Sequence, residues 1–442
     1  MANLLQQHVV QVSRAPQPSM RAAEAHPGPD KAPAESQKHG RSDLSTTGPR
    51  VLAYSHDGYG LGHLRRNLRI LSGLKKRRPD VDAAVVTGAM GAAAIAAGFD
   101  VRCFVLPAVT KVANGCYVAE EGFQGTDVFA ARTGLIEEAF RSHRPDLVLV
   151  DRYPLGMKNE LLPALEWLRS KGGNAAVVLG LRDIIDERAT VQEEWERAGH
   201  NEAIRRYYDS VLVYGDQAVF DPISEYSIDS DVAELTHFTG YLSDELGCRQ
   251  ASEIRGQLLP AGDRLALCTL GGGRDAFPIA AAFLGAMARL QADGWAALLI
   301  TGPYMHAEDV ARLRAVSAAS HTTVVEMVAD LPSHLAAADA VVCMGGYNTM
   351  CEVLAMGTPA VVVPRVQPRQ EQLIRASLFA GRGLVRMIDP VVLSAESLAA
   401  EMRIASEEGT RGCDSLKTLR HDGVFESAAS LDSLLPVRAG NP

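Results

Sequence analysis

Residues 343–352 combine small residues, a hydroxyl group and a carboxylate in a pattern suited to binding a phosphorylated ligand. The apolar run 340–344 predicts a buried parallel strand, two glycines predict a turn, and Thr349 marks the expected start of a helix. Because backbone N–H groups at a helix start point toward an anion, this arrangement predicts a phosphate site. Thr349 and Glu352 also match a capping box, which would give them a structural role. The candidate binding residues here are Gly345, Gly346, Asn348, Thr349 and Glu352.

A glycine-rich loop that ends in a histidine follows the first expected strand, 51–55. Gly60 and Gly62 are candidates for contacts with a phosphate or an acceptor, and His63 opens a helix whose leucines recur at helical spacing. A neutral imidazole can take a proton from a hydroxyl or water, and Asp57 can orient that imidazole or act as the base itself. A histidine that only packs or caps is the alternative. The loop lacks the acid that a dinucleotide fingerprint has about 20 residues further on.

A glycine triplet, Gly271, Gly272 and Gly273, follows the expected strand 265–270 and precedes Arg274. Glycines there permit close approach of the backbone to a diphosphate, and a plain tight turn is the alternative. The Arg274 cation can neutralise a diphosphate there in place of a metal ion.

Polar side chains at the ends of parallel strands face a ligand crevice, so the first half of the chain offers candidate acceptor contacts. These are Asp151, Arg152, Tyr153, Arg182, Asp183 and Tyr214. Asp229 and Asp231 have the spacing of a metal-binding D-x-D motif, but no apolar strand precedes them, so we interpret them as loop residues. No residue is predicted to bind a metal.

An alternation of strands and helices, which occurs twice in the chain, must position these residues. Strand-length apolar runs separated by helical stretches of about ten residues or more predict right-handed crossovers and parallel sheets. The fold class is therefore α/β, with two doubly wound Rossmann-like domains facing each other across a cleft. The expected strands are 51–55, 83–87, 101–106, 147–150, 176–181 and 210–214, then 265–270, 296–301, 322–328, 340–344, 360–364 and 384–388.

Composition divides the chain into four parts. Residues 1–48 are rich in Gln, Ser, Pro and Ala without an apolar segment, which predicts a disordered leader and not a secretory signal. Residues 49–245 and 262–422 are the two expected Rossmann-like domains. We expect the tail, 423–442, to pack back on the first domain.

Charge and cysteine content argue against several functions. The chain has 442 residues and a formal net charge of −9 without a long Lys/Arg run, which argues against a nucleic-acid partner. Its seven cysteines are scattered without a C-x-x-C pair, as expected for reduced thiols in the cytoplasm and not for disulfides or a zinc site. The longest uncharged run, 83–99, is interrupted by three glycines and falls short of a membrane span, so no integral membrane segment is expected.

The segment from the 340–344 strand to Gln372 resembles the donor half of nucleotide-sugar glycosyltransferases. The order G-x-x-T-x-x-E, short helix, Gly-Thr-Pro, apolar strand and Glu371-Gln372 is similar to glycosyltransferase family 28, which includes the lipid II-forming N-acetylglucosaminyltransferases. It is also similar to a group of bacterial predicted glycosyltransferases. The histidine-terminated loop resembles the first-domain loop of the same transferases and of some nucleotide-sugar hydrolases.

This resemblance implies a GT-B fold, in which the first domain binds the acceptor and the second binds the nucleotide-sugar. It implies that Glu352 holds the ribose hydroxyls, that Glu371 and Gln372 bind the donor sugar, and that Met327 and Val328 contact the base through their backbone. The chain departs from the family pattern at Arg274, and its Glu371 stands where many members have Asp or Gln, so the identity of the sugar does not carry over.

We therefore expect a metal-independent glycosyltransferase that moves a sugar from a nucleotide diphosphate-sugar, with UDP favoured, to a hydroxyl acceptor. No cofactor is expected, because the nucleotide-sugar is a co-substrate. The alternatives are a nucleotide-sugar hydrolase that activates water with His63, a nucleotide-sugar 2-epimerase, and a nucleotide-sugar-binding protein without catalysis. An epimerase would need paired acids in the cleft that the sequence does not reveal.

Overall fold

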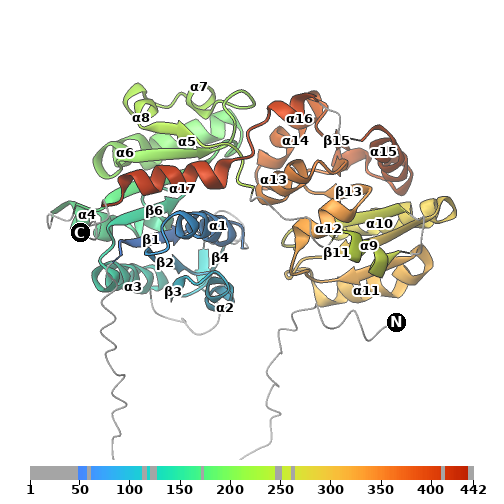
Figure 1. The fold of residues 1–442 in the computed structure, drawn as a ribbon, viewed down its shortest axis with the longest axis horizontal. Helices are drawn as coiled ribbons and strands as arrows, with labels where there is room; N and C mark the ends of the chain where they lie inside the picture. The colour runs from blue at the N-terminus through green and yellow to red at the C-terminus, as the bar shows by residue number, and fades with distance from the viewer. Residues whose placement is uncertain are drawn as a thin grey trace, which may run out of the picture.

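Two parallel α/β domains lie side by side in the computed structural model, which describes residues 48–56, 61–111, 117–119, 127–170, 174–243, 251–259, 264–409 and 414–436 (Figure 1). The first sheet has the order β3-β2-β1-β6-β7-β8-β9, and the second has the order β12-β11-β10-β13-β14-β15. Chain order reverses beside β1 in the first sheet and beside β10 in the second, which confirms the predicted pair of doubly wound domains.

Every strand pair within these two sheets is parallel. The strands of the first sheet are β1 (Arg50–Ser55), β2 (Asp82–Thr87), β3 (Arg102–Val105), β6 (Leu147–Asp151), β7 (Ala176–Arg182), β8 (Ser210–Tyr214) and β9 (Thr236–Phe238). Those of the second are β10 (Arg264–Thr269), β11 (Trp295–Ile300), β12 (Thr322–Val325), β13 (Ala340–Cys343), β14 (Ala360–Val362) and β15 (Arg386–Met387). A small antiparallel pair, β4 (Val109–Lys111) and β5 (Tyr117–Ala119), stands apart from both sheets.

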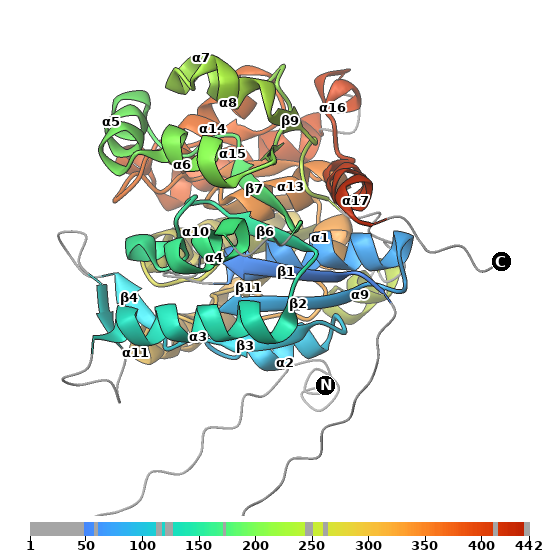
Figure 2. The same ribbon diagram turned by 90° about the vertical axis from the view of Figure 1, so that its left-hand side faces the viewer.

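Helices cover both faces of the first sheet because successive strand residues point to opposite sides. Val51 and Ala53 of β1 share a core with α1 (Gly62–Arg77), while Leu52 and Tyr54 share a core with α3 (Val128–His143) and α4 (Leu162–Ser170) (Figure 2). The other helices of this domain are α2 (Ala92–Ala97), α5 (Arg188–Ala198), α6 (His200–Tyr207), α7 (Pro222–Tyr226) and α8 (Ser230–Glu234), with the 3₁₀ turn η3 (Met157–Asn159).

The second sheet is covered in the same way. Residues of α10 (Phe277–Leu290), α11 (Ala307–Ser317) and α15 (Ala395–Glu408) share a core with its outer face. Residues of α12 (Leu331–Ala337), α13 (Tyr347–Met356) and α14 (Glu371–Gly381) belong to the core that continues into the first domain. The remaining elements are α9 (Ala251–Leu258), α16 (Asp414–Thr418), η4 (Gln291–Asp293), η5 (Ala318–Ser320) and η6 (Pro390–Val392).

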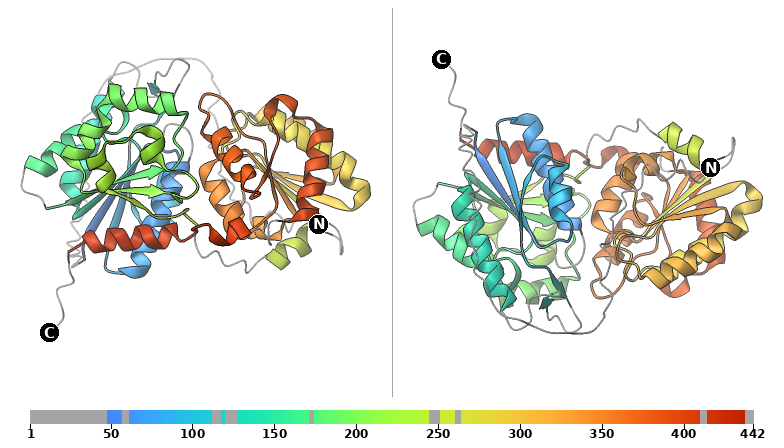
Figure 3. Two further views of the ribbon diagram at one scale, coloured as in Figure 1. Left: turned by 90° about the horizontal axis from the view of Figure 1, so that it is seen from above. Right: turned by 90° about the horizontal axis from the view of Figure 1, so that it is seen from below.

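The last helix, α17 (Gly423–Leu434), leaves the second domain and packs along α1 of the first (Figure 3). Gly73 permits this approach, since a Cβ atom there would come within 2.8 Å of Val424 Cγ1. Helix α17 therefore packs against the helix that carries His63.

No helix in the described part of the chain is both long enough and apolar enough to cross a membrane.

Candidate functional site

His63, the second residue of α1, lies beside two buried charged side chains. Its Nδ1 atom is 3.2 Å from Asp151 Oδ2 and 2.8 Å from Arg66 Nη2. Arg66 Nη2 donates to both Asp151 oxygens, at 2.8 and 2.7 Å. Burial would raise the pKa of Asp151, but the charges of Arg66 and His63 hold it well below its usual range. Asp151 is therefore an ionised carboxylate that touches the imidazole.

Asp151 reaches His63 because β6 pairs with β1 in parallel, which brings the ends of the two strands together. The sequence placed Asp151 among the acceptor contacts and proposed Asp57 as the partner of His63. Asp57 and Gly60 lie outside the described residues, whereas the described geometry gives the imidazole an acid from β6.

The proton on His63 Nδ1 decides what this imidazole can do. If Nδ1–H donates to Asp151, Nε2 has a lone pair and can accept a proton. If Nδ1 accepts from Arg66, Nε2 carries the proton and cannot act as a base. Only the first tautomer suits general-base chemistry. The Asp151 carboxylate, 3.2 Å from Nδ1, favours it, whereas the Arg66 guanidinium, 2.8 Å from Nδ1 and able only to donate, favours the second.

Two acids of the second domain are paired with arginines of the first. Glu352 of α13 is 5% exposed and forms an ion pair with Arg69 of α1. Glu371, the first residue of α14, is 7% exposed and forms an ion pair with Arg182 at the end of β7. A substrate hydroxyl that binds either carboxylate must therefore replace or share an arginine.

The charges around Glu371 perturb both members of its pair. Burial would raise the pKa of Glu371, but Arg182, Arg375, Arg152 and Arg365 together lower it to about 2. Burial, together with Arg152, Arg66 and Arg375, lowers the pKa of Arg182 to about 10 although Glu371 opposes the shift. The surroundings of Glu371 therefore have a strongly positive potential.

The predicted turn between strand β13 and helix α13 forms, but the helix begins earlier than expected. Gly346 is the N-cap and α13 starts at Tyr347, so Thr349 lies in the first turn and makes no capping hydrogen bond. The capping-box alternative is therefore wrong. Asn348 Nδ2 donates to the Gly62 carbonyl at 3.0 Å, which joins this turn to the loop before His63.

The glycine triplet is packed against the neighbouring loop. Gly273 has φ 85°, and a Cβ atom there would lie 1.9 Å from the Thr301 carbonyl oxygen. Gly271, Gly272 and Arg274 remain exposed beside it. The close packing explains Gly273 as a structural glycine and leaves the first two glycines accessible to a ligand.

Strand β12 ends at Val325, three residues before the predicted end. Met327 and Val328, the residues expected to meet the base, therefore lie in the loop after the strand and are half-buried.

The predicted acceptor residues divide into two groups. Tyr153 is half-buried and its hydroxyl accepts from Arg152 at 3.1 Å and from Arg369 of the second domain at 3.2 Å. Asp183 and Tyr214 are fully buried: Asp183 accepts from Tyr241, and the Tyr214 carbonyl accepts from Tyr347. The second group belongs to the packed domain interface.

Asp231 lies in the first turn of α8 and not in a loop as predicted, whereas Asp229 is the residue that precedes this helix. Both carboxylates pair with Arg205 at the surface. No group of three or more His, Cys, Asp or Glu side chains that could hold a metal occurs among the residues with a described position.

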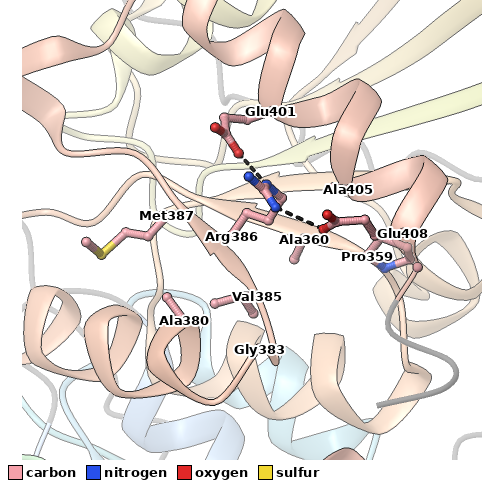
Figure 4. A pocket seen from close by; sticks show the side chains of 11 residues that line it. Pro359, Ala360, Ala380, Gly383, Val385, Arg386, Met387, Glu401, Ala405 and Glu408 are labelled. Carbon is pink, nitrogen blue, oxygen red and sulfur yellow. Dashed lines mark hydrogen bonds and ion pairs between the residues drawn. The ribbon is translucent and has the colours of Figure 1, made fainter.

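A separate pocket lies at the amino ends of β14 and β15 (Figure 4). Arg386 inside it is paired with Glu401 and Glu408. Ligands of doubly wound sheets bind at the carboxyl ends of the strands, so this pocket is not the candidate site. Its lining residues are Pro359, Ala360, Ala380, Gly383, Val385, Arg386, Met387, Glu401, Ala405, Glu408 and Gly409.

Sequence reasoning missed the arginines that complete the site. Neither Arg66 nor Arg69 is among the predicted site residues, yet Arg66 is 3% exposed and Arg69 reaches Glu352. Their spacing of three and six residues from His63 places all three on one helix face. That spacing was the signal available in the sequence.

Comparisons with solved structures show which fold the chain has. The fold is that of solved GT-B glycosyltransferases: the glycotransferase of kitacinnamycin has a TM-score of 0.61 at 19% identity and covers 88% of this chain and 100% of its own. CalG4, the calicheamicin glycosyltransferase, has a TM-score of 0.59 at 16% identity over 89% of this chain and all of its own. MurG of Acinetobacter baumannii has a TM-score of 0.55 at 14% identity over 87% of this chain and 99% of its own. These likenesses confirm the predicted GT-B fold.

Residues 266–414 match the glycosyltransferase family 28 C-terminal domain, so the second domain carries the family domain recognised in the sequence. A curated relative from Bradyrhizobium sp. (strain ORS 278) is 28% identical over 179 residues, which is 40% of this chain and 48% of the relative. One from Bacillus subtilis (strain 168) is 27% identical over 175 residues, 39% of this chain and 48% of the relative. Both are UDP-N-acetylglucosamine--N-acetylmuramyl-(pentapeptide) pyrophosphoryl-undecaprenol N-acetylglucosamine transferases. The chain spans about half the length of these relatives.

Proposed function

We propose that this chain is a cytoplasmic, metal-independent glycosyltransferase that moves a sugar from a nucleotide diphosphate-sugar, with UDP favoured, to a hydroxyl acceptor. The observation that carries the proposal is that α1 contacts both the candidate base site and the candidate donor site. Its first turn holds His63 against Asp151, and Arg69, two turns later, holds the Glu352 carboxylate of the second domain. The candidate base and the candidate donor site therefore meet along one helix.

The donor is assigned to the second domain, which carries the family 28 match. Glu352 accepts hydrogen bonds from the two ribose hydroxyls once Arg69 moves aside, because a carboxylate can accept two at once. The diphosphate lies at the N-terminus of α13, where a Cβ atom on Gly346 would meet nothing within 4 Å and the first backbone N–H groups have no partner within the helix. Glu371 and Gln372 bind the sugar hydroxyls, and Met327 and Val328 contact the base.

Transfer then requires removal of the acceptor proton. His63 Nε2 takes that proton while the hydroxyl oxygen bonds to the anomeric carbon and the bond to the diphosphate breaks. Asp151 stabilises the imidazolium that forms, as the carboxylate does in other acid–histidine pairs. The α13 dipole and Arg274 stabilise the departing diphosphate.

A panel of nucleotide-sugars, each incubated with the full chain with and without a bacterial extract as acceptor source, tests the proposal. The expected result is release of the nucleoside diphosphate that depends on the extract. Free sugar formed without extract would contradict the proposal and identify the chain as a hydrolase. Binding without turnover would identify it as a nucleotide-sugar-binding protein without catalysis.

A further inference from the structure

Four arginines surround the single carboxylate of Glu371 at the domain interface. Arg152 and Arg182 come from the ends of β6 and β7, and Arg365 and Arg375 come from the loop after β14 and from α14. Together they define an arginine cluster, and all four lower the pKa of Glu371. The two domains thus contribute two cations each to one small region.

The carboxylates nearby do not neutralise this cluster. Arg182 has its ion pair with Glu371, and Arg365 is 3.9 Å from the same carboxylate. In the described part of the chain, no carboxylate lies within 4.0 Å of Arg152 or Arg375. Glu371 is therefore within ion-pair distance of two of the four guanidinium groups, and the other two have no described carboxylate that close.

Two further acids border the cluster, of which the first is engaged by other groups and the second lies close to Arg365. Asp183 accepts hydrogen bonds from the Ile184 amide and the Tyr241 hydroxyl. Asp275 is 3.8 Å from Arg365 and half-exposed. Four guanidinium groups therefore face these three carboxylates, and a further acid near Arg152, Glu194, is paired with Arg369.

Three of the guanidinium groups also have unused buried donors. The Nε atoms of Arg152, Arg365 and Arg375 are buried and lack a hydrogen-bond partner, and the Arg375 side chain is fully buried. Buried polar groups in folded proteins nearly always have a partner, so unused donors indicate a missing acceptor. An Nε–H and a neighbouring Nη–H form a fork that matches the two oxygens of a carboxylate.

The position of the cluster indicates which substrate supplies that acceptor. A side chain on Gly345 would come within 3.5 Å of the Gln372 carbonyl, so the turn before α13 lies directly against the start of α14. In the proposed donor site the diphosphate binds at the first of these helix starts. The group attached to the diphosphate, which is the sugar, then lies at the second, beside Glu371 and the arginines.

We propose that the arginine cluster binds a carboxylate on the transferred sugar, so that the donor is a nucleotide-linked uronic acid. The proposal rests on the proposed function, because it takes the nucleotide position from it. Arg152 and Arg365 bind the sugar carboxylate from opposite domains, while Glu371 accepts from a ring hydroxyl. Arg152 keeps φ at 83°, a conformation that is uncommon for residues other than glycine.

Equilibrium binding to the full chain tests the proposal with two matched donor pairs, UDP-glucose with UDP-glucuronate and GDP-mannose with GDP-mannuronate. Each pair differs only in CH₂OH against COO⁻ at C6. For whichever base the chain prefers, we expect it to bind the nucleotide-linked uronate about tenfold more tightly than the nucleotide-linked neutral sugar. Arg152→Met and Arg365→Met should each remove most of that preference and leave the affinity for the neutral donor and for the free nucleoside diphosphate within about twofold.

Arg206→Met is the matched control, since Arg206 stacks on the next residue, Tyr207, as Arg152 stacks on Tyr153. It should leave the uronate preference unchanged. Equal affinity of the wild-type chain for both members of each pair would overturn the inference and leave the donor site intact. If Arg152→Met and Arg365→Met lost affinity for the free nucleoside diphosphate, the inference would also be overturned, because the arginines would then bind the diphosphate and not the sugar. Failure of every nucleotide to bind would instead reject the proposed function itself.

Discussion

The two halves of the candidate site satisfy their charges in different ways. In the first domain, Asp151 is paired with Arg66 and His63 of the same domain, so this half is complete by itself. In the second domain, Glu352 and Glu371 form their shortest ion pairs across the interface, with Arg69 and Arg182. The first half is therefore preorganised for proton transfer, whereas the second holds its acids ready for exchange with a ligand.

The largest expected effect is on the preorganised half. His63→Ala should lower turnover by about 10²–10⁴-fold, because a positioned general base contributes about that factor, and should leave donor affinity unchanged. Steady-state rates and equilibrium donor binding measure the two separately. His237→Ala, an exposed histidine of β9, is the control. Near-normal turnover in His63→Ala would make the histidine only a structural start of α1.

Changes in the second-domain half of the site should alter the affinity for the nucleotide-sugar. Glu352→Ala should weaken nucleotide-sugar binding by about 1–3 kcal/mol, because the ribose hydroxyls lose their acceptor in a closed site. Calorimetric titration measures this, with Glu407→Ala on the exposed face of α15 as the control. A Glu352→Ala variant that melts early yet binds the donor normally would reduce Glu352 to an interface residue.

The buried pair of the first domain should appear in the pH dependence of stability. The pKa of Asp151 is lowered in the folded chain, so its ionised form contributes stability above the unfolded value of about 3.9, and that contribution is lost as the pH falls below it. Asp151→Asn should cost about 1–3 kcal/mol at pH 7, and the difference from wild type should shrink toward pH 3. Chemical denaturation across this range measures it.

Asp231→Asn is the comparison for that experiment, since Asp231 pairs with Arg205 at the surface and should change stability little. A difference for Asp151→Asn that stays constant from pH 7 to pH 3 would mean that the carboxylate charge does not stabilise the fold.

The smallest effect is expected from Arg69. Arg69→Ala frees Glu352 for the ribose, so nucleotide binding should become a few-fold tighter, as removal of an internal competitor does. Arg65→Ala, on an exposed position of the same helix, is the control and should have no effect. Weaker binding in Arg69→Ala would show that this arginine contacts the ligand itself.

The same difference between the halves explains what the sequence predicted. Apolar runs and glycine turns predicted the two sheets, and strand ends predicted the region of Asp151 and Arg182, because these signals are local. The pairing of His63 with Asp151 depends on β1 lying beside β6, and that of Arg69 with Glu352 joins residues 283 positions apart. No local pattern encodes such contacts. The start of α13 was misplaced because Gly346, without a side chain, stands at the cap in place of Thr349.

The central claim is that the ribose of the nucleotide replaces Arg69 at the Glu352 carboxylate. Its most direct test is a crystal structure of the full chain with UDP bound. The account predicts ribose hydroxyls within hydrogen-bonding distance of both Glu352 oxygens, the diphosphate at Gly346 and Asn348, and Arg69 displaced from Glu352. Nucleotide bound at another place while the Arg69–Glu352 ion pair stays intact would contradict it.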